Sequence, residues 1–235
     1  TGAGTLSYSS SLAWDNAAGE FTAPTLVATA SSSILKLSGV TLLKVDTSLG
    51  NYFAGQSAGN ATTSGQYNTA TGLFSLSSLT SGTGNSGFGR GSLNAVTQGS
   101  NNIGVGYNAG INIDLGDDNV AVGANALGNV AGADNNVGIG SGAGSSNVTG
   151  SNNLFLGYGA DVLSDGLTNA TAIGYNATVG ASNSLILGGS GVKVGIGTST
   201  PFTVLSVNGQ TAADYFTAVS TTATSTFPKL TSTYL

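Results

Sequence analysis

A regular repeat constrains this chain more than any other feature of its sequence. Glycine recurs at every seventeenth position from Gly55 to Gly174, and Asn stands four positions before each of these glycines except the last, where Ala170 replaces it. Ala or Ser stands three positions after each glycine. Self-similarity at a fixed period is the signature of stacked repeats. Three successive copies of the unit are Asn102, Gly106, Ala109; Asn119, Gly123, Ala126; and Asn136, Gly140, Ala143.

Each unit alternates apolar and small residues between its Asn and its Gly. After Asn102 come Ile103, Gly104 and Val105, and alternation with a period of two predicts a strand. We expect the first and third residues, here Ile103 and Val105, to form the core. A short segment rich in Gly and Asn precedes each repeated Asn and predicts a turn. One unit therefore holds two short strands and two turns.

A coil as short as this unit cannot bury its own apolar face, but stacking on identical coils can bury it. The pattern predicts an all-β chain with a parallel β-solenoid, in which each Asn stacks on the next as a ladder. Eight coils at roughly 4.8 Å give a rod about 35–40 Å long. Because the coils are thin, we also expect several chains to pack together along the axis.

The unit, written Asn-φ-small-φ-Gly-x-x-Ala/Ser with φ apolar, closely resembles the head repeats of trimeric autotransporter adhesins of the YadA-like type. It is also similar to repeats in phage tail fibres and in large bacterial surface-fibre proteins. The resemblance covers about residues 48–197. It implies a left-handed β-roll that is homotrimeric. The adhesin coil is usually shorter than the unit found here, and one shorter coil occurs in this chain, from Gly174 to Gly188.

Both ends of the chain break the period. Residues 1–47 are expected to form a small β connector, with one hairpin around Trp14 and Phe21 and another around a Ser38–Gly39 turn. Residues 198–235 form a second connector, in which 216–230 resembles 21–37. The expected division is therefore a connector, a β-roll over 48–197 with a shorter final coil, and a connector.

Composition excludes several classes of function. Only 6% of residues are charged, and the five basic residues are scattered, which disfavours nucleic-acid binding. Cys and His are both absent, so thiol catalysis and the usual zinc ligands and general base are missing. No apolar run is long enough to insert into a membrane. Gly104 to Ala109 fits a dinucleotide-binding fingerprint, but it lies in phase with the repeat and no helix is expected after it. We expect no enzyme activity.

Calcium is the one metal for which the sequence offers candidate ligands. Asp117 and Asp134 are one period apart and should stack in adjacent turns, with Asp114 and Asp118 nearby. Oxygen ligands at repeated turns can coordinate Ca²⁺. The alternative is a solvated turn, because Asn occupies the Asp118 position in other coils, at Asn101, Asn135 and Asn152. The alternative is favoured, and no cofactor is expected.

Three tyrosines share the position directly after the repeated glycine. If Tyr107, Tyr158 and Tyr175 face outward, they could form a surface for sugars or a protein partner. The simpler interpretation is that each ring packs over the neighbouring coil.

These observations favour a structural role. We expect an extracellular shaft, on a cell surface or virion, of an adhesin-type trimeric fibre that presents a binding region. Its partners would be its own copies, in a homotrimer and in a head-to-tail filament, with a host-surface or glycan receptor as a further partner. The alternatives are a phage tail-fibre shaft and a carbohydrate-binding β-roll module.

Overall fold

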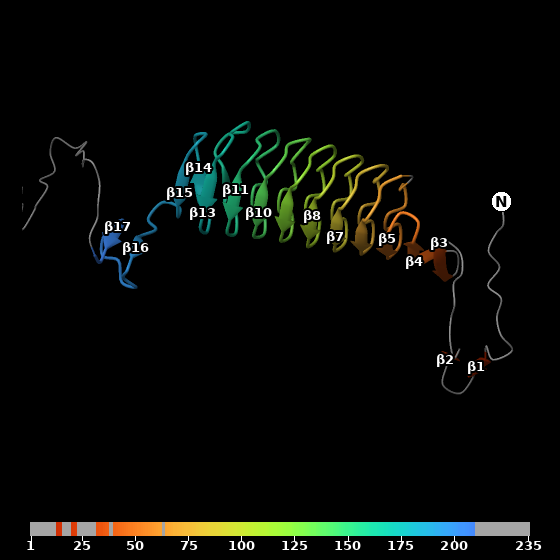
Figure 1. The fold of residues 1–235 in the computed structure, drawn as a ribbon. Coiled ribbons are helices and arrows are strands. Elements are labelled where there is room, and N and C mark those ends of the chain that lie inside the picture. Colours follow the sequence, from red (N-terminus) through yellow and green to blue (C-terminus); the bar gives the residue numbers. More distant parts are fainter. Residues whose placement is uncertain (1–12, 16–19, 23–31, 38–39, 63, 210–235) are drawn as a thin grey trace, which may run out of the picture. The chain divides into compact units, whose positions relative to one another are not determined.

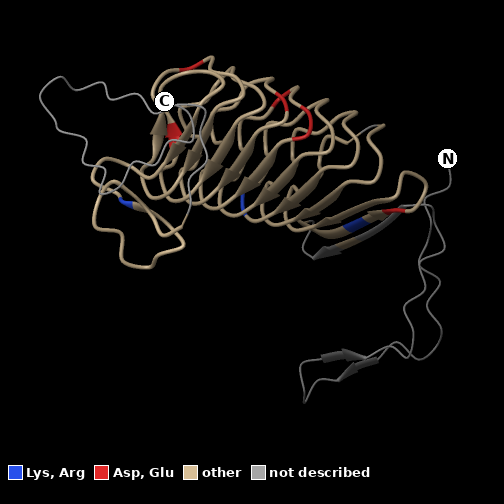
Figure 2. Ribbon diagram, turned by 60° about the vertical axis from the view of Figure 1, so that its left-hand side comes forward, with Lys and Arg blue, Asp and Glu red and all other residues tan. Residues whose placement is uncertain are grey.

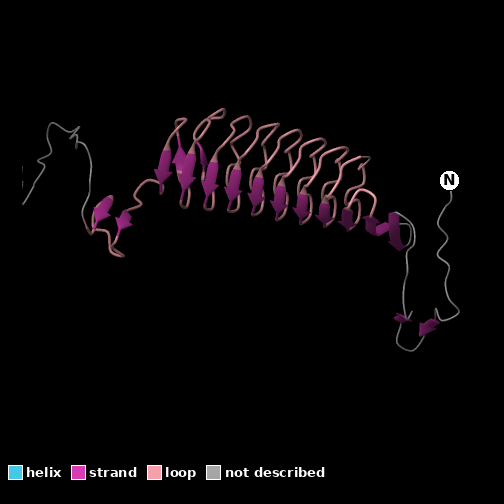
Figure 3. Cartoon of the chain, viewed as in Figure 1, coloured by secondary structure: helices cyan, strands magenta, loops and turns pink. Residues whose placement is uncertain are grey.

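The computed structural model describes residues 13–15, 20–22, 32–37, 40–62 and 64–209. Over these residues the chain is all-β, and its main element is a parallel β-solenoid of about 8 coils (Figures 1 and 3). The chain divides into two compact units, Thr1–Val192 and Lys193–Leu235. No helix of the described residues is long and apolar enough to cross a membrane.

One strand from each coil joins a single sheet of 11 strands. Neighbouring coil strands are parallel and in register, so that Gly104 pairs with Ala121, one period further along the chain. The last step is shorter, because Thr171 pairs with Leu185. Both the period and the single shorter coil are confirmed. The coil strands are β5 (Asn51–Ala54), β6 (Thr69–Thr71), β7 (Ser86–Phe88), β8 (Ile103–Val105), β9 (Val120–Val122), β10 (Val137–Ile139), β11 (Leu154–Leu156), β13 (Thr171–Ile173) and β15 (Leu185–Leu187).

The side of the coil opposite these strands differs from the prediction. A second strand forms only in the last coils, where β12 (Asp161–Val162) pairs with β14 (Thr178–Val179). In earlier coils this side still bonds to its neighbour, as in Leu76 N–H to Ser92 O at 3.0 Å. Alternate residues on this side of the coil have positive φ, such as Phe74 at 59° and Leu76 at 49°. A β-strand cannot form with these backbone angles.

Antiparallel strands cover the N-terminal edge of the solenoid. β3 (Ser32–Leu37) pairs with β4 (Val40–Asp46), and β4 pairs antiparallel with β5. β1 (Ala13–Asp15) pairs with β2 (Glu20–Thr22), placing Trp14 opposite Phe21. The antiparallel pairing predicted at both places is therefore confirmed, while the turn residues 16–19 and 38–39 lie outside the described residues.

The second unit contains one described pair of strands. β16 (Val194–Ile196) and β17 (Leu205–Val207) are parallel, with Gly195 opposite Ser206. The stretch 216–230, which resembles 21–37, lies outside the described residues.

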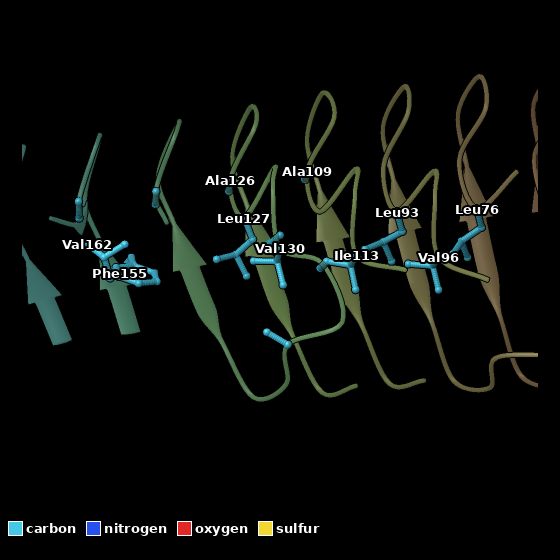
Figure 4. Close-up of a cluster of buried hydrophobic side chains, with 14 of the residues drawn as sticks. Leu76, Leu93, Val96, Ala109, Ile113, Ala126, Leu127, Val130, Phe155 and Val162 are labelled. Carbon is cyan, nitrogen blue, oxygen red and sulfur yellow. The ribbon is translucent and has the colours of Figure 1, made fainter. Parts of the chain in front are cut away.

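The interior is filled by the middle residue of each coil strand and by residues from the opposite side (Figure 4). Large and small residues alternate between these two positions. A Cβ added to Gly138 would lie 2.8 Å from Leu127 Cγ, and one added to Gly144 would lie 2.5 Å from Phe155. The core is therefore packed by complementary sizes between adjacent coils.

The expectation that Ile103 and Val105 form the core is wrong. Both point outward and are 40% and 39% exposed, whereas Asn102 and Gly104 point inward. Alternate residues of a strand share a face, so burial of the Asn brings the small residue inward with it. Gly104 is small because a Cβ there would meet Ser92 Oγ and Leu93 Cγ, from the preceding coil, at 2.5 and 2.8 Å.

Candidate functional site

A buried ladder of asparagine side chains joins the coils. Asn102 Oδ1 accepts hydrogen bonds from Asn119 N–H at 3.0 Å and from Asn119 Nδ2 at 3.1 Å. Asn119 Nδ2 also donates to Ala133 O at 2.8 Å. The ladder ends where Ala170 N–H donates to Asn153 Oδ1 at 2.8 Å. The Asn ladder that the sequence predicted is thus present, and its rungs are Asn51, Asn68, Asn85, Asn102, Asn119, Asn136 and Asn153.

The repeated glycine lies at a close approach between successive coils. Gly123 has φ +126°, and a Cβ there would lie 2.6 Å from Gly140 C. The position needs Gly for both reasons. Gly106 N–H donates to Phe88 O at 2.8 Å, and Ile103 N–H donates to Asn119 O at 2.8 Å. These amides of the glycine-rich stretch are used between coils and do not form a phosphate cradle.

The outward side of the long sheet is apolar over its middle coils. We call the first and third residues of β8 to β11 the outer strip, and its most exposed members are 39–40% exposed. The corresponding residues of β6, Thr69 and Thr71, are polar, although the same face carries the exposed Tyr52 in β5 and Phe88 in β7. The outer strip consists of Ile103, Val105, Val120, Val122, Val137, Ile139, Leu154 and Leu156.

The acidic residues proposed as calcium ligands cap backbone amides of the preceding coil. Asp117 Oδ1 accepts from Ser100 N–H at 2.6 Å, and Asp134 Oδ1 accepts from Asp117 N–H at 2.8 Å. Ser100 and Ser151 serve the same purpose in neighbouring coils. These residues form a second, exposed ladder along the turns.

Asp114 and Asp118 complete the proposed set without converging on a site. Asp114 Oδ1 accepts from Thr97 Oγ1 at 2.5 Å, and Asp118 has φ +57°. The Asn residues at the Asp118 position in other coils have nearly the same φ, because Asn and Asp tolerate the left-handed region. Among the described residues no group of three or more acidic side chains could hold a metal ion, and Figure 2 shows the acidic residues at several separate places along the solenoid. The geometry supports the solvated-turn interpretation.

Two further carboxylates also act as caps. Asp161 is buried and accepts from Ser146 N–H at 2.9 Å and from Ser145 Oγ at 3.1 Å. Asp165 accepts from Val148 N–H at 2.7 Å and from Thr149 N–H at 2.9 Å. Burial opposes ionisation of Asp165, but these hydrogen bonds outweigh it and hold its pKa below the ordinary value of 3.8.

The three tyrosines form part of a column on the outside of the coils, at the position after the repeated glycine. Tyr158 and Tyr175 stack with ring centroids 5.5 Å apart and planes 12° apart. Arg90 lies over the Tyr107 ring, 5.3 Å from its centroid, and donates to Tyr107 Oη at 3.0 Å. The rings pack over neighbouring coils, yet they remain 48–68% exposed. Outward exposure and packing over a neighbouring coil, the two alternatives for these residues, therefore occur together.

Comparison with known proteins gives no match among family models, curated proteins or solved structures. The candidate surfaces are consequently defined by this chain's own geometry: the outer strip and the tyrosine column. Sequence reasoning found the second and misplaced the first. The signal that identifies the outer strip is the shared strand face of the Asn and the small residue two positions later.

Proposed function

We propose that this chain is a shaft segment of an extracellular trimeric fibre, in which the outer strips of three copies pack against one another. The single observation that carries the proposal is the outer strip itself. It places aliphatic side chains on one side of consecutive coils, where they remain partly exposed in one chain. Contiguous apolar surface of this kind marks an interaction site.

The rest of the structure supports a mechanical role. The Asn ladder runs from Asn51 to Asn153, and backbone hydrogen bonds between coils continue beyond it, which gives a stiff support in a chain that has no cysteine. Three copies in parallel would bring equivalent residues of the outer strip together, coil by coil. A surface adhesin and a phage tail fibre would use such a shaft in the same way, to carry a binding region away from its anchor.

The trimer is tested by measuring the mass of the purified chain by light scattering, with circular dichroism as a check of folding. We expect three times the chain mass. Val105→Asp and Ile139→Asp should reduce the mass to that of one chain, because charge replaces apolar contact in the centre of the strip. Thr71→Asp, at the equivalent position in the polar coil β6, is the matched control and should remain trimeric. Folded wild-type protein with a monomer mass would exclude the proposal.

A further inference from the structure

The tyrosine column contains a gap of two rungs. Its residues from Arg90 onward are Arg90, Tyr107, Ala124, Ser141, Tyr158, Tyr175 and Gly189. The column is continuous, because backbone bonds link each position to the next coil: Asn125 N–H to Tyr107 O, and Gly142 N–H to Ala124 O, both 2.9 Å. Ala124 and Ser141 carry no ring. The rings of Tyr107 and Tyr158 are thus three coils apart, or about 14 Å.

Each tyrosine has one covered and one free ring face. Arg90 covers Tyr107 from the N-terminal side, so its free face points toward Ala124. Tyr158 and Tyr175 cover each other, so the free face of Tyr158 points toward Ser141 and that of Tyr175 toward Gly189. Gly188 lies over Gly174, so Gly189 occupies the next rung and has no side chain to fill it.

The order of filled and empty rungs is self-complementary. Two rings at Tyr158 and Tyr175 follow two empty rungs at Ala124 and Ser141. A two-fold axis perpendicular to the column, midway between Ser141 and Tyr158, places the ring pair of one copy in the gap of the other. The same axis places Tyr107 of the second copy at the rung of Gly189.

We propose that two copies associate side by side and antiparallel through this column. The interdigitated rings form one stack, which runs from Tyr107 of one copy through the ring pair of the second and then the ring pair of the first to Tyr107 of the second copy. All three free faces of each chain are then covered, with Arg90 at both ends. Offset stacking of aromatic rings is favourable. A single sugar bound in the gap would cover only Tyr107 and Tyr158 and leave the free face of Tyr175 exposed, which is why the second copy fits better.

This association does not rest on the trimeric shaft. Single chains would give dimers, whereas a trimer carries three columns, so pairing of one column would give a hexamer and the remaining columns could add further trimers. The outer strip variants and the column variants therefore report on separate contacts.

Sedimentation equilibrium over a range of concentrations tests the proposal. The wild-type mass should rise at least twofold as concentration increases. Ser141→Tyr places a ring in the rung that the partner's Tyr158 would enter, and this exposed substitution should abolish doubling. Tyr67→Ala removes a ring that is 68% exposed outside the column, and doubling should persist. A wild-type mass that does not change with concentration, or doubling that survives Ser141→Tyr, would overturn the proposal.

Cross-linking of single-cysteine variants tests the orientation, since the chain has no cysteine of its own. Ser141 lies beside the proposed axis, so the two copies of Ser141→Cys should be joined by a short bismaleimide more efficiently as concentration rises. Gln56 lies in the same column, about 50 Å along the stack from its mate in the antiparallel arrangement. Gln56→Cys should show no concentration-dependent product. Concentration-dependent product from both variants would mean parallel, in-register association and would overturn the two-fold arrangement, as would the absence of product from Ser141→Cys.

Discussion

At the scale of single residues, backbone strain is exchanged for core packing. Leu76, Leu93 and Leu127 are buried with φ between 46° and 52°. The left-handed conformation costs about 1–2 kcal/mol for an L-residue, whereas burying a leucine side chain contributes about 1.5–3 kcal/mol. Burial outweighs strain, because each leucine packs beside a coil whose strand has a small residue at the facing position.

Replacing Gly123 by Ala tests the close approach between coils. The Cβ would lie 2.6 Å from Gly140 C in a backbone at φ +126°, so we expect a loss of at least about 1–3 kcal/mol in the free energy of unfolding. Urea denaturation measures it. Gly142→Asn is the matched control. Gly142 has φ +68° and open space around it, and Asn already occupies this position at Asn108 and Asn125, so little change is expected.

Removing one rung of the Asn ladder should cost more than removing an exposed amide. Asn119→Ala leaves Asn136 N–H and Ala133 O without their partners in the interior. Each orphaned buried group costs about 1–3 kcal/mol. Asn129→Ala, which removes a bond from an exposed amide to Ser145 O, should change stability far less. Equal effects of the two substitutions on the urea midpoint would show that a buried ladder amide contributes no more to stability than an exposed amide.

How much can be predicted about single residues from the sequence depends on which face of the strand is assumed to be buried. The recurring positions of Asn, Gly and Ala can be identified from the sequence, because each residue type meets the same local structural requirement in nearly every coil. The inward direction is not readable from hydrophobicity, since the larger aliphatic residues such as Ile103 lie outside. Leucines from the opposite side of the coil, such as Leu93, already fill the interior, so Gly or Ala occupies most of the inner strand positions.

At the scale of elements, short strands persist because neighbouring strands pair with their edges and side chains cap the turns at their ends. The first coil is covered by β4, where Lys44 Nζ lies 5.4 Å from the centroid of the buried Phe53 ring. Asp46 then caps the turn into β5 by accepting from Ser48 Oγ at 2.6 Å and from Leu49 N–H at 3.1 Å. These contacts close the N-terminal end of the core and protect an edge strand.

The caps between coils predict a specific sensitivity to acid. The pKa of Asp165 is lowered in the folded chain, so its contribution to stability is present above the ordinary value of 3.8 and is lost as pH falls through the folded value. Asp165→Asn should therefore lower the urea midpoint at neutral pH and flatten its decline in acid. Asp118→Asn introduces the residue found at this turn in other coils, and it should keep the wild-type profile. Identical profiles for wild type and Asp165→Asn would contradict the assignment.

The predictability of the elements follows the strength of the local signal. Both N-terminal hairpins can be found from turn residues between alternating segments. The second strand of each coil cannot be excluded, because alternation of apolar residues there looks the same whether or not φ is positive. Only the sterics of the closed coil force Leu76 and its equivalents into the left-handed region.

At the scale of the whole molecule, stability is a sum over nearly identical coils. Deleting residues 119–135 removes one full period and joins Asp118 to Asn136, which restores every column. We expect a folded, cooperative solenoid that is shorter by one coil. Deleting 119–134 leaves the register shifted by one position and turns the inner face outward beyond the junction. Thermal unfolding followed by circular dichroism should therefore show a much larger loss for the smaller deletion.

The stacking of coils also determines how the solenoid responds to tension. Pulling the two ends apart along the stack loads the hydrogen bonds between the outermost coil and its neighbour, so coils should peel away one at a time. Each released coil frees about 55 Å of extended chain in place of about 5 Å of stack. A solenoid built this way lengthens in nearly equal steps and dissipates work at each one.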